Sequence, residues 1–521
     1  MAFTRFLYPS TAFFGSFLLF AIQPIAAKAF LPHFGGSAAV WSVSILFFMT
    51  LLLGGYWYAH LLLRLPFILQ RVIHGGLLAA SVLFVARVFF SGNTLISPSL
   101  VGGESNFASP VWELLAALLI SGAAWSGWGM FGPTGEAVVH TVTFFLLCVV
   151  CHGELYRRRP SASFLTSFYG VMALGSTLGA LFVNFLAPAI FRSGLWEFPL
   201  GLFFAFVVAL ALLKSFWREF LSPRAYYAAV LTLSCFFLLT LSWRAITLTR
   251  SAVAALRNFY GPLVVLKGHS GADAFYKLLN GATIHGLQYR NGPLSYSPAS
   301  YYSETSGAGL AFLHHPRKEQ GRSLRVGVVG LGAGTLAAYC REGDSFLFYE
   351  INPAVVEIAK TQFDYVKRCP DARIVEGDGR IVLARELREK GSRRFNLLVV
   401  DAFSDDAIPV HLFTKEAMEL YFAHLDGPDG ILALHVSNRY LNLVPIAMRL
   451  ADHLGLAPIV VESSADEARG IYKAVWVLMA REARVFDHRM FRAAALPVRS
   501  SVSVPLWTDH YSNILAALRW F

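Results

Sequence analysis

Three glycines stand where an apolar stretch gives way to a helix-like stretch: Gly330, Gly332 and Gly334 in "VVGLGAGTL". Glycine has no Cβ, so the backbone can turn sharply there and approach a ligand closely. The dinucleotide fingerprint G-x-G-x-x-G wants another glycine where this chain has Thr335. The pattern G-x-G-x-G is instead common where S-adenosylmethionine-type co-substrates bind. A plain tight strand–helix turn is the alternative interpretation.

Two acidic side chains end the next two predicted strands. Glu350 lies 20 residues after Gly330, and a carboxylate there can accept hydrogen bonds from both ribose hydroxyls. Asp378, followed by Gly379, ends the third strand and can accept a hydrogen bond from an adenine amino group. Either acid alone also fits a solvated strand end. Their occurrence on consecutive strands favours an adenosine-binding site.

An acidic loop follows the fourth predicted strand. Asp401 ends the strand in "VVDAFSDDAIPVHLFTKEAMELY", and Asp405 and Asp406 lie in the loop. Close carboxylates suit a cationic substrate, and one of them can take a proton from an amine before the amine attacks. We therefore predict catalytic roles for Asp401 and Asp405 and substrate binding by Asp406. An exposed acidic loop or a metal site are the alternatives. No His/Asp spacing indicates a catalytic metal, so we predict none.

These side chains need a sheet that brings the strand ends together. From Leu324 onwards, the strand-like stretches are "LRVGVVG", "SFLFYEI", "ARIVEGD", "FNLLVVD", "ILALHVS" and "KAVWVLMA". Helical stretches near 335–341, 353–363, 380–390, 414–425 and 441–453 separate several of them. This alternation predicts a doubly wound α/β sheet with its ligand at the carboxyl ends of the strands. Short strands at 263–268, 276–281 and 283–289 predict a small antiparallel sheet before it.

The first half of the chain has a different composition. The 521 residues are 55% hydrophobic and 15% charged, and the long apolar runs lie in residues 1–250. A membrane-spanning helix needs roughly 20 mostly apolar residues. Eight runs qualify: about 11–31, 39–63, 71–90, 112–131, 135–152, 165–187, 198–214 and 225–243. We expect a multi-span helical region at 1–248, a linker and small β-domain at 249–320, and an α/β domain at 321–521. A buried helical core is the alternative for the first part.

Charge and cysteine content bear on partners and location. The net charge of +11 includes basic clusters at the ends of apolar runs, which favours a lipid membrane over nucleic acid. The basic residues are nearly balanced between the two sides and do not set the orientation. The five cysteines do not form a disulfide framework, and Cys340 is expected to be packed. Small residues in "GVMALGSTLGALF" predict a close helix–helix contact.

At these residues the chain resembles the spermidine synthase family, the polyamine aminopropyltransferases. More closely, it resembles bacterial fusions of a multi-span membrane region to a spermidine synthase-like domain. The motif "DAFSDDAIPVHLFT" carries the resemblance within about 255–521, and "CHGELYRRRP" extends it into the membrane half. The resemblance implies a small β-domain before a Rossmann-like, class I methyltransferase-like domain. It also implies that Glu350 holds the ribose, Asp378 the adenine and Asp401 the reacting amine.

Further residues are implied by the same resemblance. Asp405 matches the second acid of the family's D-x-x-D motif, with one extra residue in the loop. Tyr302 and Glu304 in "YYSET" match the Tyr and Glu of a Y-H-E element, with Ser303 in place of the histidine. Gln288 takes the place of a glutamine of the β-domain. These matches predict substrate binding by Gln288, Tyr302 and Glu304.

The chain departs from the family at its glycine turn. The family has G-G-D-G, whose aspartate meets the amine-bearing tail of the co-substrate, whereas this chain has Ala333 at that position. A decarboxylated co-substrate ends in a bare ammonium that would bind that acid. Ala333 therefore leaves ordinary S-adenosylmethionine open as an alternative. Asp509 in "WTDHYSN" can supply an acid from another direction, or cap the last helix.

The sequence leaves three candidate functions. The first is transfer of the aminopropyl group of decarboxylated S-adenosylmethionine to an amine such as putrescine, with release of methylthioadenosine. The second is another S-adenosylmethionine-dependent transfer, of a methyl or aminocarboxypropyl group. The third is a membrane transporter or sensor that binds polyamine or nucleoside without turnover.

We expect a small polyamine and the lipid membrane as partners, and no nucleic acid. A homodimer is left open. The expected location is the inner membrane, multi-pass, with the C-terminal domain in the cytoplasm, where the co-substrate is found.

Overall fold

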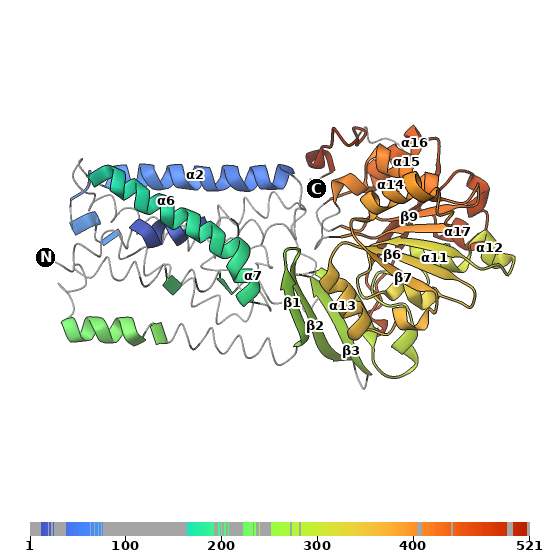
Figure 1. Ribbon diagram of the computed structural model, residues 1–521, viewed down its shortest axis with the longest axis horizontal. Coiled ribbons are helices and arrows are strands. Elements are labelled where there is room, and N and C mark those ends of the chain that lie inside the picture. The colour runs from blue at the N-terminus through green and yellow to red at the C-terminus, as the bar shows by residue number, and fades with distance from the viewer. Residues whose placement is uncertain are drawn as a thin grey trace. The chain divides into compact units, whose positions relative to one another are not determined.

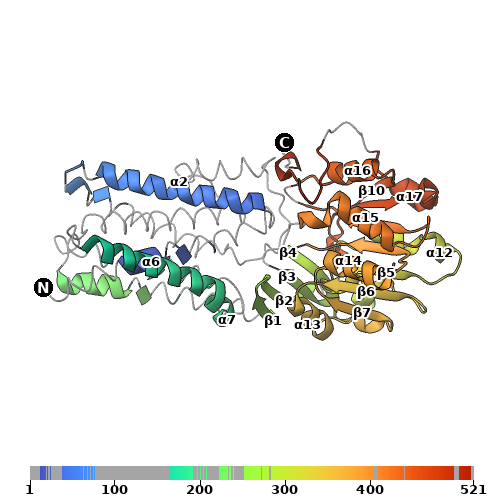
Figure 2. The same cartoon turned by 45° about the horizontal axis from the view of Figure 1, so that its top comes forward.

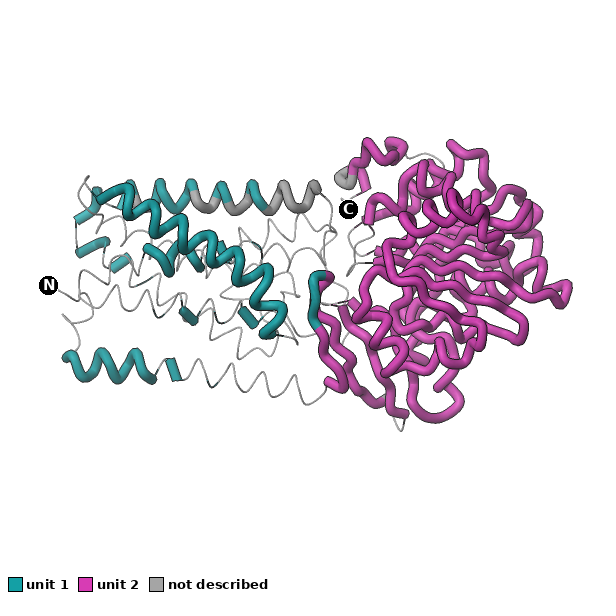
Figure 3. The backbone as a smooth tube through the Cα atoms, viewed as in Figure 1, with its two compact units in different colours: residues 1–31, 38–250, 257–259 teal, residues 32–37, 251–256, 260–521 magenta. Residues whose placement is uncertain are grey.

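The computed structural model describes two compact units (Figure 3). The first consists of residues 1–31, 38–250 and 257–259, and the second of residues 32–37, 251–256 and 260–521. Within them, the structure describes residues 12–18, 20–21, 24, 38–62, 64–66, 68–70, 72–73, 76, 164–191, 196–197, 200, 203–204, 207, 222–232, 234–235, 239, 252–270, 273–280, 283–403, 409–438, 441–497 and 504–517.

The described part of the first unit is helical. Helix α2 (Ala38–Leu62) coincides with the apolar run expected at 39–63. Helix α6 (Leu165–Leu181) continues through the π-helical turn η2 (Phe182–Leu186) into α7 (Ala187–Ile190). By length and composition, one helix among the described residues, Leu165–Ile190, is able to cross a membrane. The runs at 71–90, 112–131, 135–152 and 198–214 lie wholly or largely outside the described residues, so eight spans are not established.

The small residues of α6 make the predicted close helix contact. A Cβ on Gly175 would collide with the carbonyl oxygen of Phe13 and lie 3.1 Å from its carbonyl carbon. A Cβ on Gly179 would meet Phe17 in the same way, 3.0 Å from its carbonyl carbon. The helical segment at 12–18 therefore packs backbone to backbone against α6, as small-xxx-small patterns allow. This prediction is confirmed.

The second unit begins with a four-stranded sheet in the order β1-β2-β3-β4. Its strands are β1 (Ala252–Asn258), β2 (Gly261–Ser270), β3 (Asp273–Asn280) and β4 (Thr283–Tyr289). Strand β3 pairs in antiparallel fashion with both β2 and β4. The small antiparallel sheet predicted at 263–289 is therefore confirmed, with β1 as an additional strand.

A seven-stranded sheet follows, in the order β10-β11-β9-β8-β5-β6-β7. Its strands are β5 (Arg325–Val329), β6 (Ser345–Glu350), β7 (Ala372–Glu376), β8 (Leu397–Val400), β9 (Ile431–His435), β10 (Ala457–Ser463) and β11 (Ala474–Ala480). Strands β5 to β9 pair in parallel, and β11 is antiparallel to β9 and β10. The chain winds outward from β5 in one direction and from β8 in the other. Their junction is the switch point at which open α/β sheets bind ligands.

Helices cover both faces of this sheet (Figures 1 and 2). Helices α11 (Gly307–Leu313) and α13 (Pro353–Thr361) belong to one core, and α14 (Gly379–Lys390), α15 (Lys415–His424) and α16 (Val444–His453) to the other. Successive strand residues point to opposite faces. Thus Val399 lies in the first core and Val400 in the second. The strands are apolar without alternation because both faces are buried.

Two local features of the second unit differ from expectation. The helix predicted near 335–341 is a short 3₁₀ turn, η4 (Thr335–Tyr339), which ends at Cys340. Cys340 forms a disulfide with Cys369, which ends a second 3₁₀ turn, η5 (Val366–Arg368). Cys340 does pack against the core as expected, but the disulfide was not predicted. The two cysteines are 29 residues apart, and the sequence does not show that η4 and η5 meet in the fold.

Candidate active site

The glycine turn lies at the end of β5, held between two other strands. Gly330, Gly332 and Gly334 have φ of 102°, 54° and 80°, which favour glycine. A Cβ on Gly330 would collide with the carbonyl oxygen of Asp401 at the end of β8, and one on Gly332 would lie 2.5 Å from that of His285 in β4. The turn is therefore built on glycine both for its backbone conformation and for close approach by β8 and β4.

Glu350, at the end of β6, connects the turn to the next helix. Its Oε2 accepts a hydrogen bond from the Leu331 amide at 2.9 Å, and its Oε1 accepts one from the Asn352 amide at 2.9 Å. The residue is 8% exposed. Burial raises the pKa of Glu350 despite the opposing hydrogen bonds from the amides of Asn352 and Leu331. The ribose-binding residue expected from the sequence thus lies beside the glycine turn.

The raised pKa of Glu350 predicts a pH dependence of adenosine-ligand binding. The charged carboxylate accepts hydrogen bonds, so affinity for methylthioadenosine should be full above this pKa and fall as the pH is lowered through it. We expect calorimetric titrations that start at neutral pH and step downward to show this fall in the wild type. The Glu350→Gln variant should bind methylthioadenosine roughly tenfold more weakly than the wild type, and its affinity should not show the same fall at low pH.

Glu376→Gln is the matched control for that prediction. Glu376 pairs with Glu350 in the β6–β7 register but is exposed. Neutralising Glu376 should change neither the affinity for methylthioadenosine nor the fall of that affinity at low pH. Parallel pH curves for the wild type and Glu350→Gln would show that another group causes the fall.

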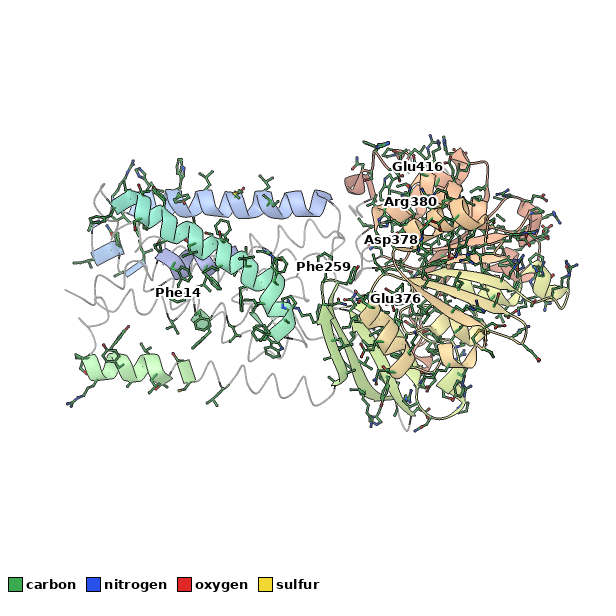
Figure 4. The ribbon with its side chains drawn as sticks, in the orientation of Figure 1. Phe14, Phe259, Glu376, Asp378, Arg380 and Glu416 are labelled. Atoms are coloured by element: carbon green, nitrogen blue, oxygen red, sulfur yellow. A yellow bond between two sulfur atoms is a disulfide. The ribbon has the colours of Figure 1, made fainter. Side chains whose placement is uncertain are left out.

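Asp378 begins α14 beside a charged network (Figure 4). Its Oδ1 accepts a hydrogen bond from the Ile381 amide at 2.9 Å, and its Oδ2 lies 2.9 Å from His411 Nε2. Burial opposes the charged form, but the hydrogen bonds from His411 and Ile381 outweigh it and lower the pKa of Asp378. Gly379 is buried beneath it, since a Cβ there would lie 2.6 Å from Val329 Cγ1.

Asp401 emerges from β8 at the switch point and is held from two sides. The hydroxyl of Tyr302 donates to its Oδ2 at 2.5 Å, and His435 Nδ1, at the end of β9, lies 2.6 Å from its Oδ1. Burial and the charge of Asp401 hold the pKa of Tyr302 well above its ordinary value, so the phenol remains a donor. The side chain of Asp401 is 10% exposed. Asp401, predicted to be catalytic, and Tyr302, predicted to bind the substrate, are therefore in direct contact.

Aromatic rings surround His435, one of the two partners of this carboxylate. The ring of Trp476 stacks on His435 with centroids 4.3 Å apart and planes at 8°. Phe403 meets the same imidazole edge-on at 4.9 Å, and Tyr301 lies 5.5 Å from it. His435 Nε2 lies 2.8 Å from the hydroxyl of Ser437, which accepts a hydrogen bond from the Val475 amide. A carboxylate that contacts Tyr302 and a ring-packed imidazole combines the charge and the aromatic surface that suit an organic cation.

His285 is a further site residue that the sequence did not indicate. It lies in β4, and its carbonyl oxygen accepts a hydrogen bond from the Ala333 amide of the glycine turn at 3.2 Å. Burial lowers the pKa of His285 to about 4; the charge of Asp401 opposes this shift and His435 adds to it. His435 is a second site residue that was not predicted from the sequence. Its position at the carboxyl end of a buried parallel strand, like that of Asp401, was the signal that could have found it.

Other predicted site residues have different surroundings. Gln288 is buried, its amide donating to the Ser295 carbonyl at 3.1 Å and accepting from the Asp364 amide at 2.9 Å. Glu304 is exposed. Asp509 makes hydrogen bonds of 2.7 and 2.6 Å with Arg380 and one of 2.8 Å with Thr414. Among described contacts, these three residues do not reach Asp401. The predicted Asp405 and Asp406 lie outside the described residues.

One cluster of metal-ligating residue types lies elsewhere in the second unit. The ligand atoms of His314, Glu319 and His488 are within 4.8 Å of one another. However, the two imidazoles stack with centroids 4.4 Å apart and planes at 18°, so their in-plane lone pairs do not converge. His488 Nδ1 also accepts the Met490 amide at the start of α17 (Arg489–Ala494). We assign no metal to this cluster.

Known proteins similar to this chain were found both by sequence and by structure. No family model matches the chain. It is 32% identical over 118 residues to the polyamine aminopropyltransferase of Vibrio vulnificus, a match that covers 22% of this chain and 36% of that protein. The chain thus spans about a third of the length of this curated relative.

Among solved structures, the chain is similar to a probable spermidine synthase from Corynebacterium glutamicum, with 13% identity over 44% of this chain and 79% of that chain and a TM-score of 0.34. It is also similar to human methyltransferase-like protein 13 in complex with SAH, with 19% identity over 39% and 93% of the two chains and a TM-score of 0.28. The α/β architecture itself rests on the observed strand order, not on these likenesses.

Proposed function

We propose that the second unit is a transferase for S-adenosylmethionine-type co-substrates, and that it transfers the aminopropyl group of the decarboxylated form to an amine such as putrescine. The position of Asp401 carries this proposal: the residue lies at the switch point beside the glycine turn, and its carboxylate contacts Tyr302 and the aromatic-packed His435. The sequence match to a polyamine aminopropyltransferase supports the same reaction.

The residues around the turn fit an adenosine-bearing ligand. Each oxygen of Glu350 receives one described backbone amide, which leaves acceptor capacity for ribose hydroxyls. Gly330 and Gly332 keep the backbone free of side chains where the ligand must approach. A bound sulfonium would supply an electrophilic carbon and a neutral thioether leaving group.

Asp401 then has the role of proton acceptor. The amine nitrogen forms a bond to the carbon next to sulfonium, and the C–S bond breaks with its electron pair going to sulfur. The nitrogen gives up a proton, for which Asp401 is the acceptor. Tyr302 and His435 each occupy one lone pair of its carboxylate, and the remaining lone pairs stay available. Methylthioadenosine and the alkylated amine are the products.

A second candidate is transfer from ordinary S-adenosylmethionine, and Ala333 favours it. This residue is 1% exposed, and its methyl group packs against Gly286 of β4, where a Cβ would collide with it. The turn therefore offers no carboxylate to a bare ammonium tail. Such a tail would depend on other groups of the site.

The full-length chain in detergent distinguishes the two candidates. It would be incubated with putrescine and either form of the co-substrate, with products identified by mass spectrometry. Methylthioadenosine plus spermidine from the decarboxylated form alone is the expected result. Product from ordinary S-adenosylmethionine alone would establish the second candidate, and no product from either would overturn both.

We further propose that the first unit is a multi-pass anchor in the inner membrane, with the second unit in the cytoplasm. Large apolar side chains are exposed on its described helices, among them Leu46 and Trp57 of α2 and Phe185 of η2. Exposed apolar surface of this kind is typical of lipid-facing helices and rare on soluble monomers. Helix Leu165–Ile190 is long enough to span the bilayer core.

A further inference from the structure

A buried imidazole nitrogen near Asp401 lacks a partner. His285 Nε2 is inaccessible to solvent and has no hydrogen-bond partner among the described residues. Leaving such an atom unpaired carries the full cost of removing it from water, so proteins rarely do so without a reason. A ligand that pairs with this atom when it binds is such a reason.

The position of His285 points to the reacting centre. Its carbonyl group is fixed to the glycine turn, and its Cβ lies 4.0 Å from the place a Cβ on Gly332 would take. The backbone and Cβ of His285 therefore lie against the glycine turn, which Asp401 contacts at Gly330. The charges of Asp401 and His435 also act on the pKa of the His285 ring. In contrast, both oxygens of Asp401 already accept a hydrogen bond from the protein.

The charge state of His285 determines which substrate groups its ring can bind. Its pKa of about 4, lowered by burial, keeps the ring neutral at neutral pH. A neutral imidazole adds no positive charge beside a cationic substrate. In the tautomer with the proton on Nδ1, Nε2 presents a lone pair that accepts a hydrogen bond.

We propose that His285 binds the attacking amine of the substrate, accepting a hydrogen bond from its nitrogen through Nε2. This inference rests on the proposed function, since it names the residue that holds the acceptor in that reaction. Asp401 then lies behind the amine as proton acceptor, and His285 fixes the direction of the nitrogen lone pair.

Two polar substitutions test the reach of this contact. In His285→Gln the side-chain oxygen can occupy the place of Nε2, whereas in His285→Asn it is withdrawn by one bond. Full-length protein saturated with methylthioadenosine would be titrated with putrescine by calorimetry. We expect roughly 10- to 100-fold weaker putrescine binding for His285→Asn and a loss of less than about fivefold for His285→Gln. Affinity for methylthioadenosine should stay within about twofold in both.

His269→Asn is the matched control, because His269 is an exposed histidine of the same four-stranded sheet. It should bind putrescine like the wild type. Equal behaviour of the Asn and Gln variants, whether both bind or both fail, would overturn the role of Nε2. Failure of the wild type to bind putrescine would overturn the amine as its ligand.

The transfer assay separates this inference from the proposed function. Wild type that binds putrescine through His285 but forms no product would overturn only the transferase. Active wild type whose kcat/KM for putrescine is unchanged by His285→Asn would overturn only the contact.

Discussion

Asp401→Asn should lower aminopropyl transfer by about 10²- to 10⁴-fold, because an amide cannot accept the proton that the amine releases. The substitution keeps the size of the side chain and one of its oxygens. Tyr302 therefore retains an acceptor, and the aromatic rings around His435 stay in place. Affinity for methylthioadenosine should change by less than about threefold, since in the proposed function Glu350 and the glycine turn bind that ligand. Steady-state kinetics and calorimetry on the full-length protein measure the two effects.

Asp452→Asn is the control for Asp401→Asn. Asp452 is an exposed acid of α16 that pairs with Arg449 at 2.9 Å, and its loss should change neither property. Turnover by Asp401→Asn within about tenfold of the wild type would rule out Asp401 as the proton acceptor. An equal loss of turnover and of methylthioadenosine binding would instead indicate a structural role.

Gly330→Ala should destabilise the second unit by roughly 3 kcal/mol or more and abolish adenosine-ligand binding. Alanine at φ of 102° is strained, and its methyl group would collide with the carbonyl oxygen of Asp401. The ends of β5 and β8 would have to separate at the point where the ligand binds. Thermal unfolding of the full-length protein, followed by near-ultraviolet circular dichroism, measures the loss of stability.

Gly321→Ala separates backbone strain from the collision. Gly321 also has a positive φ, of 68°, but nothing lies within 4 Å of the Cβ it would gain. Its substitution should cost about 1–2 kcal/mol and leave ligand binding intact. Equal destabilisation by the two substitutions would show that close packing of the turn against β8 is not important.

The strands of the α/β domain were predictable because their apolar runs are separated by helical stretches and glycine turns. Strands β5, β6, β7, β8, β9 and β11 and helices α13, α14, α15 and α16 all lie where they were predicted. Strand β10 was not predicted, although "APIVVES" is apolar at its centre. It follows α16 and pairs with β11 at one end of the strand order.

The site was predictable where a polar residue ends a buried strand. Glu350, Asp378 and Asp401 follow this rule, and so does His435. His285 does not, because it lies within a strand of the other sheet and reaches the site only when β4 packs on the glycine turn. Asp509 is an acid whose partner, Arg380, is 129 residues away in the sequence. Local pattern does not encode such contacts.

The Cys340–Cys369 bond gives the domain a marker of its cellular environment. Glutathione keeps cysteines reduced in the bacterial cytoplasm, whereas the periplasm is oxidising. In the cytoplasm the pair would be two thiols, and η4 and η5 would be joined by packing alone. Treating intact cells with a thiol-alkylating reagent and weighing the resulting peptides would therefore show whether the second unit lies in a reducing or an oxidising compartment. Two alkyl groups on the cysteine pair would place the second unit in the cytoplasm, and an intact disulfide would place it outside the cytoplasm.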